Sequence, residues 1–481
     1  MNRIKIQVVK LICSLLLFGS QANNLMAQEI KQSQEFQTFE SYKNTGYDQS
    51  MRPQFHFTSL KNWINDPNGM VWYDGEYHLF FQHNPKGTEW GNMTWGHAVS
   101  TDIVHWTQLP HAILPYGGGT IFSGTAVVDH NNSLGKQQGD IKTLVAIFTF
   151  AKEPFYQAAA YSTDKGRSFQ LVNNGRSVVP NQGVDKTERD PKIFWHEASK
   201  KWIMVLWVQK AEKEGTPDEK RGKVRFFNSD NLTDWALASE LERNWAYECM
   251  DFVELPVDGN PKNKKWLLYD ASFDYEIGDF DGKTFTSNKK AFKGDLGTNF
   301  YAAQTFNNSP DGRAVIIGWM NGTWKKPTFF ESAGMPFNLQ MSFPSTLELR
   351  TTPEGIRLFR IPVKEIERLY FKSYKFNNLS LAKAVKKLAD VKAELIDMSI
   401  DFHAVDSLQL NVRGLVIDWK NGQFAFKNTK IPAVAIDGKV KIRLLLDRTS
   451  LELFANEGAA VATFYASPDV QNKRIRGTCR K

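Results

Sequence analysis

The stretch GMVWYDGEYHLFFQ, residues Gly69–Gln82, shows the pattern from which the fold of this chain can be predicted. An extended apolar segment leads into the turn Asp74-Gly75, and a second apolar and aromatic segment follows. Asp-Gly between two such segments is a strong hairpin signal, and the second segment has the composition of a strand buried on both faces. The stretch therefore predicts a β-hairpin that contributes to a core.

The same pattern occurs five times in the first three quarters of the 481-residue chain. The four further copies are Gly124–Phe150, Pro191–Val208, Cys249–Ser272 and Tyr301–Met320. A second element, an Asp followed by an aromatic residue, recurs at intervals of 62, 66 and 51 residues, at Asp102, Asp164, Asp230 and Asp281. Units of this length that cannot bury their own faces pack around an axis, which predicts an all-β fold with a five-bladed β-propeller over residues 51–361. The alternative is an all-β sandwich with chance internal similarity.

The pattern changes after the propeller. Residues 362–376 are predicted to be a linker with a short helical connector, and residues 377–481 a C-terminal antiparallel β-sandwich. Its predicted strands are Val391–Phe402, Ser407–Val412, Leu415–Trp419, Lys439–Asp447 and Ser450–Phe454. The segment Leu379–Leu388 could be helical instead. Because the chain stops at Lys481, the sequence leaves open whether this domain is complete.

Three basic residues precede the apolar stretch Leu11–Phe18, which is followed by small and polar residues. This layout predicts a signal peptide over residues 1–27, followed by an N-terminal extension over residues 28–50. We therefore expect an exported protein, periplasmic or extracellular, with no membrane span. Ile12 before Cys13 is not the small residue that lipid attachment requires, so a soluble exported form is favoured.

The net charge of +8 comes from Lys and Arg that are interspersed with acidic residues along the sequence. No arginine-rich stripe or nucleic-acid module is present, so the pattern favours a solvated surface over a nucleic-acid partner. The nine His and three Cys are not spaced as metal ligands, and we predict no metal and no cofactor. Nothing in the sequence indicates an oligomeric state.

Three carboxylates occupy equivalent places in the repeat. Asp66 lies in WINDPNG, Asp190 in RDP and Glu248 in YEC, each at the start of the first strand of a predicted blade. These starts open onto one end of the central channel, so the three side chains are predicted to converge. Acids in one pocket repel each other and at least one pKa should rise. One ionised and one protonated carboxyl group are what cleavage of a glycosidic bond requires.

Six motifs run through the predicted propeller in a characteristic order. They are WINDPNG (Trp63–Gly69), FQHNP (Phe81–Pro85), WGNMTWGHAVS (Trp90–Ser100), FSGT (Phe122–Thr125), RDPK (Arg189–Lys192) and EC (Glu248-Cys249). In these motifs the chain resembles glycoside hydrolase family 32, which contains invertases, inulinases and levanases. The resemblance implies retaining hydrolysis of β-fructofuranosidic bonds in levan, inulin or sucrose-like sugars, through a covalent fructosyl-enzyme. The funnel of a propeller favours exo attack from a chain end, but the sequence leaves exo and endo attack open.

The resemblance also implies roles. Asp66 matches the family's nucleophile, Glu248 its acid/base and Asp190 the aspartate that holds fructosyl hydroxyls at the transition state. Positions that line the fructose subsite match Asn65, Gln82, Trp90, Phe122, Ser123 and Arg189, and Trp319 is a further candidate wall. Strand alternation predicts that Cys249, next to Glu248, points away from the site.

The sequence departs from the family's pattern in two places, and two alternative functions remain open. Asn299 stands where many relatives carry Asp, and the segment Trp319–Phe343 lacks the spacing of many fructan hydrolases, so substrate preference stays open. One alternative is an inverting arabinan- or xylan-type five-bladed hydrolase. The other is a non-catalytic sugar-binding propeller, which would not need all three carboxylates.

Overall fold

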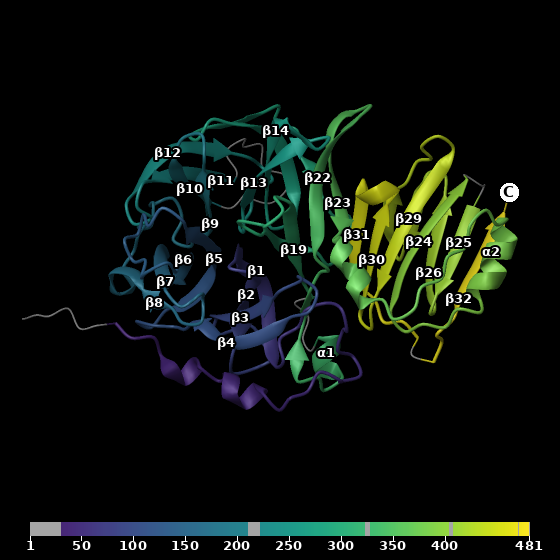
Figure 1. Cartoon of the computed structure of the whole chain (residues 1–481), viewed down its shortest axis with the longest axis horizontal. Helices are drawn as coiled ribbons and strands as arrows, with labels where there is room; N and C mark the ends of the chain where they lie inside the picture. The colour runs from purple at the N-terminus through teal and green to yellow at the C-terminus, as the bar shows by residue number, and fades with distance from the viewer. Residues whose placement is uncertain (1–29, 210–221, 323–327, 404–406, 470, 481) are drawn as a thin grey trace, which may run out of the picture.

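The computed structural model describes residues 30–209, 222–322, 328–403, 407–469 and 471–480. Nearly all of the regular structure in these ranges is β-strand, as the sequence predicted. Figure 1 shows a rounded body that holds the strands up to β23 beside a second body that holds β24 to β32. The predicted signal peptide, residues 1–27, lies outside the described residues.

The strands of the rounded body form three separate sheets and one ten-stranded sheet, whose two halves are joined by the single parallel pair Val257–Leu349. Taken as five antiparallel groups, these strands are consistent with the five blades predicted for a β-propeller. The first two contain β1 (Asn62–Tyr73), β2 (Glu76–Asn84), β3 (Thr94–Ser100) and β4 (Thr107–Ile113), then β5 (Thr120–Asp129), β6 (Thr143–Ala151), β7 (Tyr156–Ser162) and β8 (Gln170–Leu171). The third contains β9 (Arg189–His196), β10 (Lys201–Gln209), β11 (Lys223–Ser229) and β12 (Trp235–Glu242).

The fourth contains β13 (Asp251–Val257), β14 (Asn260–Tyr269), β15 (Asp274–Phe280), β16 (Phe285–Ser287) and β17 (Phe292–Lys293). The fifth contains β18 (Tyr301–Thr305), β19 (Ala314–Met320), β21 (Gln340–Met341), β22 (Ser345–Thr352) and β23 (Gly355–Pro362). The strand β20 (Phe337–Asn338) returns to pair in parallel with β1. Each predicted hairpin corresponds to the first two strands of one blade.

The first strands of the blades contact one another around the centre. Strand β1 contacts β5 and β18, β5 also contacts β9, and β18 also contacts β13. Between β9 and β13 a buried ion pair makes the connection, since Lys192 Nζ lies 2.9 Å from Asp251 Oδ2. The same ammonium group donates to the carbonyl of Thr305 in β18, at 3.1 Å. The innermost strands of three blades are thus tied together.

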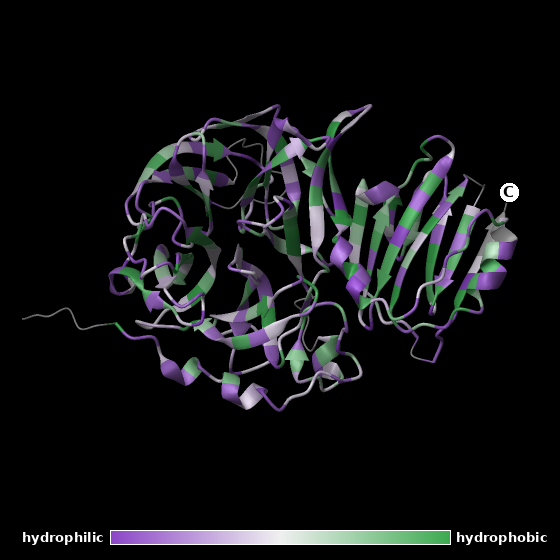
Figure 2. Ribbon diagram, viewed as in Figure 1, coloured by the Kyte–Doolittle hydropathy of each residue, from purple (hydrophilic) through white to green (hydrophobic). Residues whose placement is uncertain are grey.

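The second body is a β-sandwich of two antiparallel sheets. One sheet has the order β24 (Ile396–His403), β29 (Lys439–Leu446), β30 (Ser450–Ala455), β31 (Ala460–Tyr465). The other has the order β28 (Thr429–Pro432), β27 (Gln423–Phe426), β26 (Leu415–Lys420), β25 (Ser407–Val412), β32 (Ile475–Arg480). Hydrophobic and hydrophilic residues alternate along the strands, and the hydrophobic set forms a shared core (Figure 2).

Short helices occupy the connections. They are η1 (Gln34–Phe36), η2 (Phe39–Tyr42), η3 (Val172–Gly175), α1 (Phe329–Ser332), η4 (Lys364–Leu369), α2 (Leu381–Leu388) and η5 (Asn456–Gly458). The helical alternative for Leu379–Leu388 is therefore the one that the structure adopts, as α2. None of the helices in the described ranges has the length and apolar character needed to cross a membrane.

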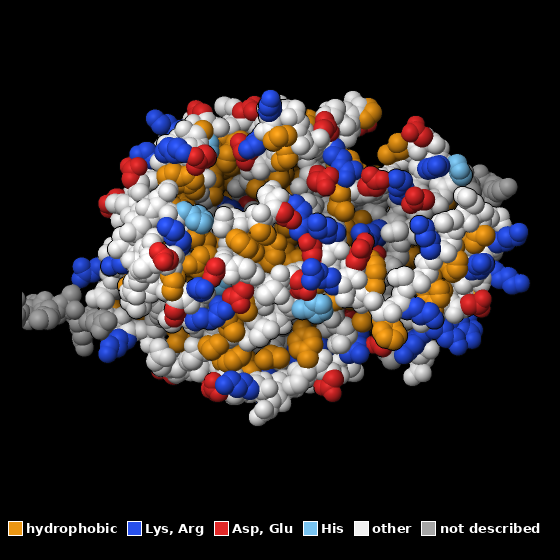
Figure 3. Space-filling model, in the orientation of Figure 1, with side chains coloured by type: hydrophobic (Ala, Val, Ile, Leu, Met, Phe, Trp, Pro, Cys, Tyr) orange, Lys and Arg blue, Asp and Glu red, His pale blue; other side chains and the backbone are white. Residues whose placement is uncertain are grey.

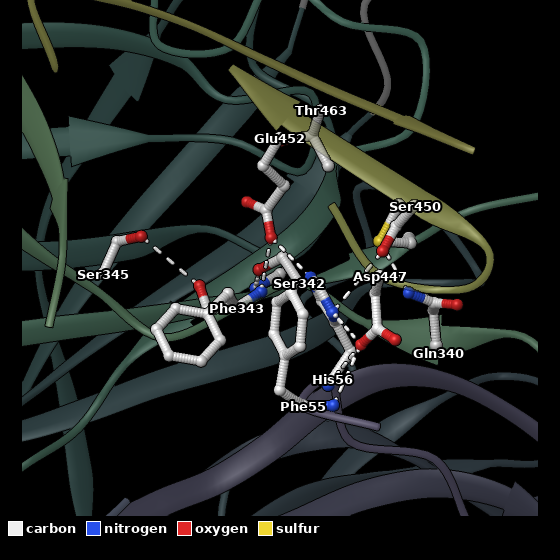
Figure 4. A network of polar contacts seen from close by, with 12 residues as sticks. Phe55, His56, Gln340, Ser342, Phe343, Ser345, Asp447, Ser450, Glu452 and Thr463 are labelled. Carbon is white, nitrogen blue, oxygen red and sulfur yellow. Dashed lines mark hydrogen bonds and ion pairs between the residues drawn. The ribbon is translucent and has the colours of Figure 1, made fainter. Parts of the chain in front are cut away.

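A buried polar network joins the two bodies (Figure 4). His56, which precedes β1, lies between two carboxylates of the sandwich: its Nδ1 is 2.9 Å from Asp447 Oδ2 and its Nε2 is 2.8 Å from Glu452 Oε1. Asp447 also accepts the backbone N–H groups of residues 54–56. Burial alone would lower the pKa of His56, but the hydrogen bonds and charges of the two carboxylates outweigh it and raise this pKa to about 9. His56 is therefore a buried cation at neutral pH.

We predict that His56→Gln destabilises the protein by about 3–5 kcal/mol at pH 6, because it leaves two buried carboxylates without their cation. The pKa of about 9 lies above the ordinary value of 6.5, so the stabilisation is full below pH 6.5 and disappears as the pH rises through 9. The difference in stability between wild type and variant should shrink over that interval, measured by denaturant unfolding at several pH values.

The matched control is His105→Gln, which removes a surface imidazole 2.8 Å from Asp102. Because that side chain is 63% exposed, we expect at most a small change. Equal effects of the two substitutions, or a difference that grows toward pH 9, would contradict the assignment of His56 as a buried cation.

Candidate active site

Five of the residues predicted to form the site, Asn65, Asp66, Phe122, Ser123 and Asp190, lie on β-bulges, where two residues of one strand face a single residue of its partner. In β1, Asn65 and Asp66 lie opposite Gln82. The same irregularity recurs at the start of three other blades: Phe122-Ser123 opposite Thr149, Asp190-Pro191 opposite Leu206, and Ala302-Ala303 opposite Gly318. A bulge interrupts the alternation of side chains along a strand and can redirect one of them. The same type of bulge therefore occurs at equivalent places in four blades.

Asp66 is half-buried, and its Oδ2 accepts a hydrogen bond of 2.6 Å from the hydroxyl of Ser123 in the next blade. Burial raises the pKa of Asp66, the hydrogen bond from Ser123 opposes that shift, and the negative charge of Glu248 adds to it. A further hydrogen bond from the side chain of Asn65 favours the ionised form. The carboxylate is therefore held in a fixed orientation by donors from β1 and β5.

Asp190 is almost completely buried, with 4% of its side chain exposed. Burial raises the pKa of Asp190 to about 7, the positive charge of Arg189 opposes this, and the negative charges of Glu248 and Asp66 add to it. Its φ of +65° is uncommon for a residue with a side chain and belongs to the bulge. The mutual influence on these pKa values places all three carboxylates in one electrostatic environment, as the sequence predicted.

Glu248 lies just before β13, and both of its carboxylate oxygens have donors. Arg189 Nη2 donates to Oε2 at 2.7 Å, and the hydroxyl of Tyr301 donates to Oε1 at 2.6 Å. Burial and the charge of Glu248 raise the pKa of Tyr301, so this phenol stays protonated and remains a donor. Arg189 itself packs over the ring of Trp207, 4.4 Å from its centroid.

The prediction that Cys249 points away from the site is wrong. Its Sγ lies 3.6 Å from Asp66 Oδ2 and 3.5 Å from Asp190 Oδ2. Strand alternation does not apply here, because Glu248 and Cys249 have φ values of +33° and +43° and precede the first ladder pair of β13. Burial, and then the neighbouring carboxylates, raise the pKa of the Cys249 thiol far above its ordinary value. The group is thus a weak S–H donor between two carboxylates and no nucleophile.

The remaining predicted residues surround this centre at different depths. Trp90 is 48% exposed and its ring meets Phe122 edge-on at 6.0 Å, so these two rings form an aromatic rim. Gln82 is buried opposite the bulge of β1. Asn65 accepts a hydrogen bond of 2.8 Å from Trp63 Nε1. Trp319, proposed as a wall, is buried beside Trp63 with their ring centroids 6.1 Å apart.

Sequence reasoning missed Tyr301 and a chain of contacts that supports β1 from outside the ring. His83 donates from Nδ1 to the carbonyl of Trp63 at 2.7 Å, so its Nε2 is the acceptor for the Tyr42 hydroxyl at 3.0 Å. Burial lowers the pKa of His83 to about 4, which keeps the ring neutral in this role. His83 lies within the FQHNP motif, but nothing in the sequence indicates its partner Tyr42 in the N-terminal extension.

The arrangement can hold one carboxylate ionised while another carries a proton, which is the requirement for acid–base and nucleophilic work on one bond. Within the described residues, no group of three or more His, Cys, Asp and Glu side chains is placed to hold a metal ion.

Comparisons with known proteins agree on one family. The model of the glycosyl hydrolases family 32 N-terminal domain matches residues 56–362, and the model of the family's C-terminal region matches residues 365–476. The chain is 38% identical over 478 residues to a levanase of Bacillus subtilis, covering 89% of this chain and 68% of that protein. It is 30% identical to an extracellular exo-inulinase of Aspergillus ficuum, covering 90% of this chain and 93% of that protein.

The fold is similar to that of solved relatives. The crystal structure of an exo-inulinase from Aspergillus awamori has a TM-score of 0.76 at 27% identity, covering 90% of this chain and 96% of that one. A β-fructofuranosidase from Schwanniomyces occidentalis, complexed with fructosyl-erythritol, has a TM-score of 0.74 at 27% identity, covering 89% of this chain and 94% of that one.

We predict that Asp190→Asn raises the thermal stability of the protein, and more so at pH 8 than at pH 5. Because the pKa of about 7 lies above the ordinary value of 3.8, the folded state favours the protonated acid, and stability is lost as the pH rises through 7. The amide of the variant does not ionise and so loses no stability as the pH rises. The difference in the free energy of unfolding between variant and wild type should therefore widen by at most about 1.4 kcal/mol per pH unit crossed.

Melting temperatures at a series of pH values measure this gap. A gap that is constant with pH, or that narrows between pH 5 and pH 8, would contradict the raised pKa of Asp190.

Proposed function

The chain belongs to glycosyl hydrolases family 32, and from that premise we propose that it hydrolyses β-fructofuranosidic bonds of fructans or of sucrose. The resemblance found in the sequence motifs is thereby confirmed. The observation that supports the proposal most is that Asp66, Asp190 and Glu248 lie together: Cys249 Sγ is within 3.6 Å of Asp66 and 3.5 Å of Asp190, and Arg189 lies between Asp190 and Glu248. The names of the relatives, a levanase, exo-inulinases and invertases, point to the same substrate class.

In the first step we assign Asp66 the attack on the anomeric carbon of a β-fructofuranosyl unit. The hydroxyl of Ser123, 2.6 Å from Oδ2, fixes one carboxylate oxygen and leaves the other for the reaction. Glu248 delivers a proton to the departing oxygen, and general acid catalysis of this kind is typically worth about 10²–10⁴-fold. The product of this step is a covalent fructosyl-enzyme ester on Asp66.

In the second step Glu248 removes a proton from water, and the resulting hydroxide displaces Asp66 with retained configuration. Hydrogen bonds from Arg189 and Tyr301 to its two oxygens hold the Glu248 side chain in place for this step. We assign Asp190 to the sugar hydroxyls, because a buried carboxyl group that titrates near pH 7 can accept or donate there. Hydrogen bonds that strengthen as the oxocarbenium ion develops stabilise the transition state.

We further propose exo attack and export. A site at one end of a propeller channel, bordered by the aromatic rim of Trp90 and Phe122, fits a chain terminus better than the middle of a polymer. An extracellular exo-inulinase among the relatives supports both points. The family membership does not favour the arabinan- or xylan-type alternative, and the presence of all three carboxylates argues against a non-catalytic sugar-binding role.

The test is product analysis on levan, inulin and sucrose. Wild type should release free fructose from the start of the reaction, without intermediate oligosaccharides. Asp66→Asn, which preserves the size of the side chain and its bond to Ser123, should reduce fructose release by about 10⁴-fold or more, because the nucleophile is lost.

The control is Asp102→Asn, a carboxylate in the connection between β3 and β4, the two outer strands of the first blade, which should keep wild-type rates. Early oligosaccharides would contradict exo attack alone. Near-normal fructose release by Asp66→Asn would contradict the assignment of the nucleophile, and no fructose release by wild type from any of the substrates would contradict the function.

A further inference from the structure

The charge of the chain is distributed unevenly between its two parts. Residues 371–481 contain 19 Lys and Arg against 11 Asp and Glu, whereas residues 1–370 contain 41 of each kind. The whole net charge of +8 therefore belongs to the last 111 residues, which include the sandwich. A strong charge asymmetry between parts of a chain indicates a partner of opposite charge more than a general solubility effect.

Within the sandwich the basic residues gather at the end farthest from the propeller. Strand β31 contacts β19 and β23 of the propeller, so β24, at the opposite edge of the same sheet, is distant from it. Helix α2 packs against β32, the edge strand of the other sheet. Figure 3 shows Lys and Arg side chains crowded at this end of the molecule, with few acidic side chains among them.

We define the distal basic patch by seven exposed residues from α2, from the segment before β24, and from residues 473–476, which lead into β32. They are Lys383, Lys386, Lys387, Lys392, Lys473, Arg474 and Arg476. The segments are neighbours, since Lys392 and Arg474 form a β-bridge. Of the nearby acids, Asp397 pairs with Arg443 at 2.6 Å outside the patch, whereas Glu394 pairs with Arg448 at 2.7 Å and also lies 3.9 Å from Lys473, so it offsets a small part of the patch charge.

Exposed aromatic side chains lie in the segment that precedes α2. The side chain of Phe371 is fully exposed, and Tyr374 is 48% exposed. Tyr374 stacks on Phe376 at 6.4 Å, and Lys387 of α2 lies 5.5 Å from the centroid of Phe376, which connects this aromatic segment to the patch. Aromatic rings beside clustered lysines are typical of surfaces that rest in the interface of an anionic membrane.

We propose that the distal basic patch, with Phe371 and Tyr374, binds an anionic lipid surface. Lysine ammonium groups act as point charges toward phosphate headgroups, and the rings enter the interfacial layer. The surface would be held at the end of the sandwich remote from the propeller, which leaves the channel with Asp66 and Glu248 open to substrate. The proposal concerns residues that have no part in the proposed hydrolysis, so it stands or fails independently of it.

The test is co-sedimentation of the purified full chain with vesicles of phosphatidylglycerol and phosphatidylcholine, against vesicles of phosphatidylcholine alone. Wild type should bind the anionic vesicles and lose binding as salt is added. The triple variant Lys383→Glu, Lys386→Glu, Lys387→Glu should bind more than 100-fold more weakly, since each basic residue near such a surface contributes roughly fivefold.

The matched control is Lys262→Glu, Lys289→Glu, Lys290→Glu, which makes the same change of charge on exposed lysines of the fourth blade. It should keep most of the vesicle binding, and both triple variants should release fructose like wild type. Phe371→Ser with Tyr374→Ser should weaken vesicle binding at least tenfold while leaving binding to soluble polyphosphate unchanged.

Three results would overturn the proposal. The first is no binding of wild type to anionic vesicles at low salt. The second is an equal loss of binding in both triple variants, which would indicate a response to net charge alone. The third is vesicle binding that survives the loss of both aromatic rings, together with equal binding to polyphosphate, which would indicate a site for soluble polyanions.

Discussion

In this protein the positions of the three carboxylates, Asp66, Asp190 and Glu248, depend on how an innermost strand leaves its ladder. In a regular strand, neighbouring side chains point to opposite faces, so a motif such as Asn65-Asp66 could direct only one of its two side chains to the channel. The two-against-one bulge relieves that constraint at the same place in four blades. In the fourth blade, positive φ values at Glu248 and Cys249 serve the same purpose before the ladder begins. Because the irregularity recurs at equivalent places of the blades, the side chains that it redirects converge.

Bringing the carboxylates together costs free energy of folding, because carboxylates that share one pocket repel each other and are partly removed from water. The structure offsets this locally with directed donors: Ser123 on Asp66, and Arg189 with Tyr301 on Glu248. The groups around Asp190 do not fully offset the cost of burying its ionised carboxylate, as its raised pKa indicates. Stability must then come from elsewhere, and the hydrophobic cores of the blades and the interface with the sandwich supply it. A site that is strained in this way is expected where activity and stability compete.

The sandwich is joined to the propeller by charge as well as by apolar packing. His56 between Asp447 and Glu452 forms one link, and Arg360 Nη2, 2.5 Å from Asp295 Oδ2, lies beside it and donates to Thr463 of β31 as well. Tyr465, also in β31, donates to the carbonyl of Met320 at 2.6 Å, one residue from Trp319. These buried contacts between the two bodies mean that the second domain supports the blade that carries Tyr301 and Trp319.

Much of the fold could be predicted from the sequence because its signals are local. Asp-Gly turns, apolar second strands and the repeat interval indicated the hairpins, and the motifs indicated the three carboxylates. The bulges could not be predicted, because they depend on which residue of the partner strand is paired. The orientation of Cys249 was wrong for the same reason, since two positive φ values replaced the expected alternation. Tyr42, His83 and Tyr301 were missed because their roles arise from contacts between segments far apart in the chain.

The most direct measurement of the central claim uses Glu248→Ala with a β-fructofuranoside that has a good leaving group. Attack by Asp66 should proceed without the acid, while hydrolysis of the intermediate, which needs the base, should be slow. Mass spectrometry of the digested protein should then find one fructosyl residue attached to the peptide that contains Asp66. A burst of leaving group with no attached sugar, or a sugar on the peptide that contains Asp190, would contradict the account.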